Sequence, residues 1–286
     1  MIKLLAVDMD GTCLNSRSRM TGRTLEALRR AAAAGITVVP VTGRCLGCIP
    51  HRLAAETLKQ DNTPEGEKNR DLFRYAVSSN GALAVDIRKN QVLFQALMLR
   101  EDALSLLGMC RARGIRLGYA SHMGHRYLME GKLLTMAGRL IYGRDAWGVC
   151  CVKDMEQAVR ESCREVEELQ FYFLSGSAEK ELRSLLADCP RLTAAYTGIY
   201  GEVYSREASK GNALAALEAY LGIAQEETAC IGDGENDLSM FESAGLKIAM
   251  GNAVKELKER ADYVTDSNRR DGAAKAIERI LKLQGL

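Results

Sequence analysis

The 286-residue chain is long enough for one large domain or two ordinary ones, and its 47% hydrophobic content is sufficient for a folded core. Its net charge of +2 is too small to indicate a nucleic-acid or membrane surface, where basic residues cluster on one face. Only four apolar residues separate Lys3 from Asp8, too few for a signal peptide, and no other apolar run is long enough to span a membrane. We therefore expect a cytoplasmic globular protein, a monomer or a small homo-oligomer, whose partner is a small molecule and neither a nucleic acid nor a membrane.

The N-terminal region has the pattern of a strand, a helix and a second strand. An apolar run predicts a strand over residues 2–7, Thr21 is placed to cap a following helix, and a second strand is expected over residues 36–41. Pro40 lies inside that second strand, although it cannot donate a hydrogen bond to a neighbouring strand. A strand, helix and strand in this order favour a parallel sheet, with both following turns at the edge where ligands bind.

After a third predicted strand over residues 75–79 the pattern changes to alternating short strands and helices, which indicates an inserted domain. The strands expected in it cover residues 92–97, 116–120, 169–174 and 192–196, and the helices cover residues 100–113 and 178–187.

The α/β pattern resumes near Lys210. Helices are expected over residues 212–221, 238–244 and 272–283, and strands over residues 226–231 and 247–250. The sequence therefore predicts an α/β protein with a doubly wound parallel sheet, formed by residues 1–83 and 198–286, and an inserted α+β domain over residues 84–197.

Polar residues follow three of the predicted strands directly. These turns together supply Asp8, Asp10, Thr42, Asp233, Asn236 and Asp237. Several carboxylates at one sheet edge would repel one another unless a cation lay between them, and Mg²⁺ prefers such oxygen ligands together with a phosphate. Lys210 and Thr42 are then available to bind the remaining phosphate oxygens. The sequence thus predicts a magnesium and phosphate site.

Four short motifs occur in order along the chain: D-M-D-G-T at residues 8–12, T-G-R at 42–44, K-G at 210–211 and G-D-G-E-N-D at 232–237. Over nearly the whole chain they resemble the four motifs of the haloacid dehalogenase (HAD) superfamily, which has a Rossmann-like core. The stretches N-G-A at 80–82, A-M-G-N-A at 249–253 and A-D-Y-V-T at 261–265 further resemble its Cof-type hydrolases. Those enzymes carry a large (type IIB) cap domain between the second and third motifs, where residues 84–197 lie.

The resemblance implies a phosphatase that forms an aspartyl phosphate on Asp8. Asp10 would act as the acid and then as the base, and Thr42 and Lys210 would bind phosphoryl oxygens. Mg²⁺ would be held by the Asp8 carboxylate, the Asp10 carbonyl and Asp233, with Asp237 acting behind them. Further phosphate donors would be Asn236 and the backbone N–H groups around Gly11 and Gly43.

The resemblance also implies that the substrate is a small phosphorylated metabolite, with sugar phosphates as the expected class. It does not identify the physiological substrate. A phosphomutase of the same superfamily is the nearest alternative, and a phosphoacceptor signalling module is the alternative from a different class of protein. Asp10 disfavours dehalogenation, which needs no acid for an alcohol leaving group. One departure is the absence of a glycine shortly before Lys210, where residues 206–209 read R-E-A-S.

Two further features lie outside these motifs. His122 and His125 flank Met-Gly, which predicts a hairpin turn, and they are the candidates in the insertion for setting substrate specificity. Cys45 and Cys48 form a C-x-x-C pair among nine cysteines that lack the spacing of a disulfide framework. We predict ordinary thiols there, with a redox or metal role as the alternative.

Overall fold

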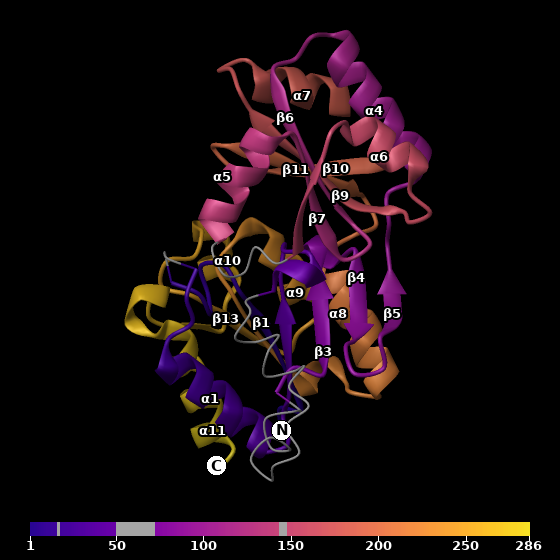
Figure 1. Ribbon diagram of the computed structural model, residues 1–286. Helices are drawn as coiled ribbons and strands as arrows, with labels where there is room; N and C mark the ends of the chain where they lie inside the picture. Colours follow the sequence, from indigo (N-terminus) through magenta and orange to yellow (C-terminus); the bar gives the residue numbers. More distant parts are fainter. Residues whose placement is uncertain (16–17, 50–71, 143–147) are drawn as a thin grey trace. The chain divides into compact units, whose positions relative to one another are not determined.

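The structure is a computed structural model that describes residues 1–15, 18–49, 72–142 and 148–286 (Figure 1). The chain divides into two compact units. The first comprises Met1–Gly43, the described part of Pro50–Gln95, and Ser209–Leu286. The second comprises Arg44–Ile49 and Ala96–Ala208.

The first unit is built on an eight-stranded sheet in the order β14-β13-β12-β1-β2-β3-β4-β5. Neighbouring strands from β14 to β3 run parallel, whereas β4 and β5 are antiparallel to their neighbours. Strands β1 and β12 lie at its centre and are completely buried, as expected for parallel strands covered on both faces. The bounds are β1 Leu4–Asp8, β2 Thr37–Val41, β3 Tyr75–Ser78, β4 Leu83–Asp86, β5 Gln91–Gln95, β12 Thr228–Gly232, β13 Leu246–Ala249 and β14 Tyr263–Val264.

The predicted helices of the first unit are present. Helix α1 (Gly22–Ala33) begins after Thr21, whose hydroxyl accepts the N–H of Thr24, so the predicted cap is confirmed. Helix α11 (Gly272–Leu283) lies beside α1 (Figure 1). Arg23 of α1 and Glu278 of α11 form an ion pair between them. The remaining helices are α8 Lys210–Leu221, α9 Leu238–Glu242 and α10 Lys255–Arg260.

Strand β2 forms despite Pro40, and the hydrogen bonds of its neighbours explain why. Thr37 N–H donates to Lys3, at the β1 side, whereas Thr42 N–H donates to Val77 of β3. The amide groups alternate along a strand, so the nitrogen of Pro40 faces the same side as that of Thr42. Strands β2 and β3 pair at one position, Val41 with Val77. Pro40 therefore faces a strand with which β2 makes few hydrogen bonds, and its missing N–H costs little there.

The second unit contains a six-stranded sheet in the order β10-β11-β9-β6-β7-β8. Its apolar core includes Leu106 and Leu107 from α4, Leu182 and Leu185 from α7, and Phe171 from β9. The strands are β6 Leu117–Met123, β7 Arg126–Glu130, β8 Val149–Val152, β9 Val166–Phe173, β10 Leu192–Tyr196 and β11 Tyr200–Ser205. The helices are α4 Arg100–Ala112, α5 Lys132–Tyr142, α6 Met155–Glu161 and α7 Ala178–Leu186.

The bounds of the two units differ from the predicted division at residues 83/84 and 197/198. The strand expected over residues 92–97 is present as β5, but β4 and β5 extend the first sheet by antiparallel pairing from β3. Strand β11 continues the second unit as far as Ser205. Neighbouring strands in the sequence therefore decide these limits, since β4 and β5 pair onward from β3 and β11 pairs with β10. The functional division into a catalytic core and a cap remains a proposal.

Candidate functional site

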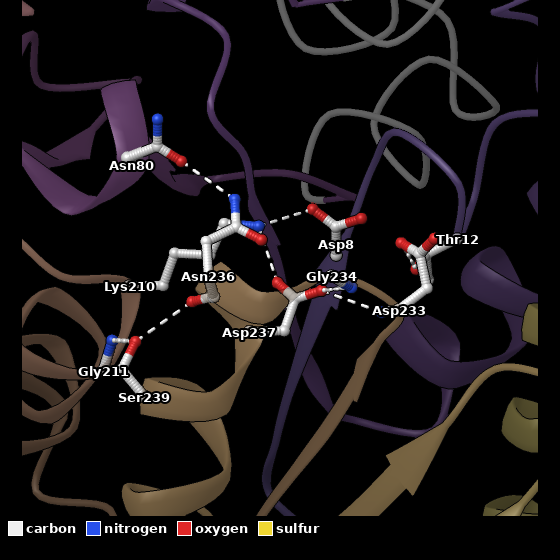
Figure 2. A network of polar contacts seen from close by, with 10 residues as sticks. All are labelled: Asp8, Thr12, Asn80, Lys210, Gly211, Asp233, Gly234, Asn236, Asp237 and Ser239. Carbon is white, nitrogen blue, oxygen red and sulfur yellow. Dashed lines mark hydrogen bonds and ion pairs between the residues drawn. The ribbon is translucent and has the colours of Figure 1, made fainter. Parts of the chain in front are cut away.

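The residues predicted to carry chemistry follow strands of the first sheet at one edge. Asp8 is the last residue of β1, Thr42 follows β2, and Asp233 follows β12. Because these strands are parallel neighbours, their carboxyl ends present these residues to the same region. Figure 2 shows Asp8, Lys210, Asp233 and Asp237 facing one another there. The topology alone thus brings residues together that are more than two hundred positions apart in the chain.

Lys210 bridges two buried carboxylates. Its Nζ donates to Asp8 Oδ1 at 2.6 Å and to Asp237 Oδ1 at 2.6 Å, and the lysine side chain is 1% exposed. Lys210 is the first residue of α8, where Ser209 caps the helix by accepting the N–H of Asn212. The cap fixes the start of the helix, and the lysine is thereby directed at the two carboxylates.

Asp237 has hydrogen-bond partners at both oxygens. One oxygen accepts from Lys210, and the other accepts the N–H groups of Asp233 and Gly234 at 2.8 and 2.9 Å. These bonds close the turn that follows β12, and Asp237 is completely buried. Its geometry is that of a residue which positions Lys210 and the Asp233 turn.

Asp233 is held in place by two side chains from distant segments. Thr12 Oγ1 donates to its Oδ1 at 3.2 Å, and Asn252 Nδ2 donates to its Oδ2 at 2.9 Å. Gly11 approaches closely, because a Cβ built there would lie 2.2 Å from Asp233 Oδ2, and its φ of +86° also favours glycine. Asn252 additionally donates to the Gly11 carbonyl at 2.9 Å. The sequence motif containing Asn252 was recognised, but its contact with Asp233 was missed.

Burial and neighbouring charges together raise the pKa values of Asp8, Asp233 and Lys210. Burial raises the pKa of Asp8 well above its ordinary value, the Asp237 carboxylate adds to the rise, and Lys210 opposes it. Burial and Asp237 likewise raise the pKa of Asp233 to about 6. Burial by itself lowers the pKa of Lys210, but the carboxylates of Asp237 and Asp8 outweigh it and the net shift is upward. The lysine is therefore a permanent cation, and the cluster retains excess negative charge.

The donor set fits a hard divalent cation. Asp8, Asp233 and Asp237 each offer a carboxylate oxygen, and these oxygens lie within 4.8 Å of one another. Oxygen ligands of this kind are those that Mg²⁺ takes, and three carboxylates with one lysine leave negative charge for a cation to offset. Burial is the main cause of the raised pKa of Asp233, and the repulsion from the Asp237 carboxylate adds to it.

Asp10 differs from Asp8 by its exposure. Asp8 is 4% exposed, whereas Asp10 is an exposed residue of the turn that follows β1. Backbone bonds close this turn, including Cys13 N–H to Asp8 O and Leu14 N–H to Met9 O. The turn therefore separates a buried carboxylate from a solvent-facing one two residues later.

Thr42, Gly43 and Asn236 are brought together around Asn80, which was not predicted as a site residue. Asn236 Nδ2 donates to Asn80 Oδ1 at 3.0 Å (Figure 2), and Asn80 N–H donates to the Thr42 carbonyl at 3.2 Å. A Cβ on Gly43 would lie 3.0 Å from Asn80 Oδ1. The available signal was the polar N-G turn at the end of β3, at the same sheet edge as the other motifs.

In the second unit, the predicted hairpin around Met123-Gly124 is confirmed, since β6 and β7 pair up to Met123 and Arg126. His122 lies on β6 with its side chain 3% exposed, and its ring packs edge-to-face on Tyr127 with 4.9 Å between centroids. Burial lowers the pKa of His122 to about 3, so the ring is neutral. His125 is more accessible, with its side chain 31% exposed. Of the two histidines, His125 is thus the better candidate for contacting a ligand.

Cys45 and Cys48 are free, buried thiols that pack with Tyr127 and Val149. A hydrogen bond with Cys48, together with burial, raises the pKa of the Cys45 thiol well above its ordinary value. A buried thiol that resists ionisation is a poor nucleophile and a poor metal ligand. The geometry favours the prediction of ordinary thiols over a redox role.

None of the helices in the described parts of the chain is long and apolar enough to cross a membrane.

Comparisons with known proteins agree with this geometry. Residues 5–277 match the family model of haloacid dehalogenase-like hydrolases. The putative phosphatase YxeH of Bacillus subtilis (strain 168) is 30% identical, over 98% of this chain and 99% of its own length. From the same organism, the 5-amino-6-(5-phospho-D-ribitylamino)uracil phosphatase YcsE is 31% identical, over 96% of this chain and 94% of its own length.

A solved structure also has the same fold. The crystal structure of a haloacid dehalogenase-like hydrolase from Bacteroides thetaiotaomicron superposes with a TM-score of 0.81 at 26% identity, over 98% of this chain and 100% of that one. The predicted superfamily and the predicted α/β fold are therefore confirmed. The chain belongs to the haloacid dehalogenase-like hydrolase family and is a phosphatase of that family.

Proposed function

We propose that this phosphatase is Mg²⁺-dependent and hydrolyses small phosphate monoesters through an aspartyl phosphate on Asp8. The observation that carries the proposal is the bridge from Lys210 to Asp8 and Asp237, in a cluster where three carboxylates lie within 4.8 Å. A buried lysine beside a buried carboxylate supplies the pair that phosphoryl transfer needs, a nucleophile and a fixed positive charge for the phosphate oxygens.

Asp8 is the proposed nucleophile because it is buried, lies at the end of β1 and faces Lys210. Its carboxylate oxygen attacks phosphorus, the bond from phosphorus to the substrate oxygen breaks, and an aspartyl phosphate forms. The charge of Lys210 and its hydrogen bond favour the ionised form of Asp8 and oppose the rise in pKa that burial and Asp237 cause. Water then attacks the same phosphorus, releasing phosphate and restoring the carboxylate.

Mg²⁺ would be held by the Asp8 carboxylate, the Asp10 backbone carbonyl and Asp233. When bound, the cation offsets the negative charge of phosphate and carboxylates and aligns the displacement. Asp237 would not bind the cation directly but would orient the groups that do. Its hydrogen bonds with Lys210, Asp233 N–H and Gly234 N–H support this role. Asn252 and Thr12 fix the orientation of the Asp233 carboxylate.

Asp10 is the proposed acid and base. Its exposed position two residues after Asp8 gives it access to the oxygen of a leaving alcohol. It donates a proton to that oxygen when the first bond breaks, and it takes a proton from the attacking water in the second step. This exchange of one proton leaves the enzyme unchanged after each turnover.

The proposed phosphate donors are Thr42, Lys210 and Asn236, with the backbone N–H groups around Gly11 and Gly43. The contacts of Asn80 with Thr42, Gly43 and Asn236 support their action as one unit. Fixed donors around the transferred group stabilise the charge that develops on its oxygens.

Sugar phosphates are the proposed substrate class. The support is that YcsE, by its name, acts on a phosphorylated ribityl compound, an open-chain sugar derivative. The second unit is proposed as the cap that recognises the organic part of the substrate, with His125 on its β6–β7 turn as a candidate contact. A screen of the purified protein against a panel of phosphorylated metabolites, scored by phosphate release, tests the class.

The first experiment is Asp8→Asn, assayed with an aryl phosphate at saturating Mg²⁺. We expect a loss of activity of roughly 10³-fold or more, because the amide is a far weaker nucleophile. Asp188→Asn, which changes an exposed carboxylate of the second unit, is the matched control and should retain full activity. Full activity in Asp8→Asn would refute the mechanism.

Two product measurements test the alternatives. Acid quenching followed by peptide mass spectrometry should find a phosphoryl group on the peptide that contains Asp8 and none in Asp8→Asn. Net isomerisation of a hexose phosphate without release of phosphate would identify a phosphomutase instead. A long-lived phosphorylated protein without turnover would identify a phosphoacceptor module.

A further inference from the structure

The turn that follows β3 has an unusual backbone. Ser79, Asn80 and Gly81 are three successive residues in the left-handed region, with φ values of 50°, 54° and 90°. For residues other than glycine this conformation costs about 1 kcal/mol or more and persists where surrounding contacts fix it. Ser79 and Asn80 are both buried, at 0% and 2% exposure. Contacts with neighbouring residues must therefore hold the backbone of this turn in its left-handed conformation.

Asn80 contacts two of the three loops that carry the proposed phosphate donors. Its N–H donates to the carbonyl of Thr42, and its Oδ1 accepts the amide of Asn236 at 3.0 Å. Gly43 packs against the same amide group, because a Cβ there would lie 3.0 Å from Oδ1 and 3.3 Å from Nδ2. Asn80 thus links the loop after β2, through its backbone N–H and the packing of its amide on Gly43, to the loop after β12, through its side-chain oxygen.

The next residue of the turn touches the third loop. A Cβ on Gly81 would lie 2.1 Å from the carbonyl oxygen of Ser209, the residue that caps α8 directly before Lys210. The backbone of this turn is therefore packed against the start of the lysine helix. Asn80 and Gly81, both in the left-handed region, thus contact all three loops within a single turn.

The carboxylates are held by other groups. Asp233 is bound by Thr12 and Asn252, and Asp8 and Asp237 are bridged by Lys210. The site accordingly has two halves, a carboxylate half that would take the cation and a half around Asn80 that would take the phosphate. Each half has its own supporting side chains.

We propose that Asn80 is a positioning residue which holds Thr42, Gly43 and Asn236 as one phosphate-binding unit, an inference that rests on the proposed function. Its side-chain amide sets the position of the Asn236 amide and of the Gly43 backbone. The competing explanation is that asparagine is present only because it tolerates a left-handed φ.

Asn80→Gly separates the two explanations, because glycine adopts the left-handed conformation freely but lacks the amide. We expect the inhibition constant of inorganic phosphate and the KM of an aryl phosphate to rise about tenfold, equivalent to about 1.4 kcal/mol. The Mg²⁺ concentration for half-maximal activity should change less than twofold. Asn90→Gly is the matched control, since Asn90 also has a positive φ of 49° but is exposed beyond β4; it should leave all three values unchanged.

A double-mutant cycle with Asn236→Ala tests whether Asn80 acts through its neighbour. The rise in the phosphate inhibition constant for the double variant should be clearly smaller than the product of the two single rises. An unchanged constant in Asn80→Gly, or effects that multiply in full, would overturn the proposal. If Asn80→Gly fails to fold, Asn80→Ser is measured with the same expected rise. Failure here leaves the Asp8 mechanism standing, because that mechanism is tested by Asp8→Asn alone.

Discussion

Buried ionisable side chains have different charge states in the two units: Lys210 in the carboxylate cluster of the first unit is charged, whereas His122 on β6 of the second unit is neutral. In the first, Lys210 lies 2.6 Å from two carboxylates and remains charged although it is buried. In the second, His122 Nδ1 lies 3.7 Å from Glu168 Oε1, too far for a hydrogen bond, and burial keeps the ring neutral. Burial favours the neutral form of a group, whereas a close opposite charge or hydrogen bonds to the charged form favour ionisation.

The difference shows why a polar motif is not by itself a functional site. His122 and His125 attract attention in the sequence as much as Asp8 and Asp10 do. One pair, however, lies where several strands end together, whereas the other lies on a hairpin whose first histidine is buried and packs edge-to-face on Tyr127.

Lys210→Met should have the largest effect, because it removes the cation that two buried carboxylates share. We expect activity to fall about 10²- to 10⁴-fold, as for the loss of a fixed charge beside a reacting phosphate. Breaking a buried ion pair should also lower the free energy of unfolding by about 3 kcal/mol. Phosphate release and urea unfolding measure the two effects. Lys282→Met, at an exposed position of α11, is the control; activity within threefold of wild type in Lys210→Met would show that the bridge is not part of the machinery.

Asn252→Ala should weaken the binding of Mg²⁺ rather than the binding of phosphate. The variant loses the hydrogen bond to Asp233 Oδ2 at 2.9 Å and the one to the Gly11 carbonyl. We expect the Mg²⁺ concentration for half-maximal activity to rise about tenfold, the usual result of removing a partner that orients a metal ligand. Titration of activity with Mg²⁺ measures it.

Asn236→Ala provides the matched contrast to Asn252→Ala. It should raise the KM for substrate and leave the Mg²⁺ requirement within twofold of wild type. Equal Mg²⁺ dependence in the two variants would show that the site does not have separate halves.

His122→Gln should change the pH dependence of stability. Its pKa is about 3 in the folded chain and 6.5 when unperturbed, so the unfolded chain binds more protons between these values. Stability contributed by neutral His122 is therefore present above pH 6.5 and is lost as the pH falls towards 3, by up to about 1.4 kcal/mol per pH unit.

Urea unfolding of wild type and of His122→Gln between those pH values measures this slope. The glutamine variant should lack it, and subtracting the two curves removes the contribution of carboxylates that titrate in both proteins. Parallel curves would show that His122 is not buried in its neutral form.

The sequence predicted the parts of the fold that repeat a local pattern. Helix α11 begins and ends at the predicted residues, and Thr21 caps α1 as expected. Strand β7 is the second strand of the predicted hairpin, whereas strands β4, β8 and β11 were missed because their short runs lack a clear alternating pattern. Helix α8 starts at Lys210, two residues before the predicted start, since the cap at Ser209 was not recognised.

The site residues were likewise predictable where they belong to a local motif and not where they depend on contacts between distant segments. Asp8, Asp233 and Asp237 were predicted because each follows an apolar strand in a recognisable motif, and the structure places them together. Asn80 and Asn252 were not assigned roles, because their contacts with Asn236 and Asp233 join segments that no local pattern relates. A sequence shows which residues carry charge at strand ends, whereas the side chains that orient them depend on the packed structure.

Asp237 has a practical consequence for anyone who wishes to redesign this enzyme. Its two oxygens serve the lysine on one side and two backbone amides on the other, so it cannot be optimised for one neighbour without moving the other. Substitutions at positions 8, 210, 233 and 237 should therefore be strongly non-additive. A library that varies these positions one at a time would find almost no improved variants, and combined changes would have to be sampled together.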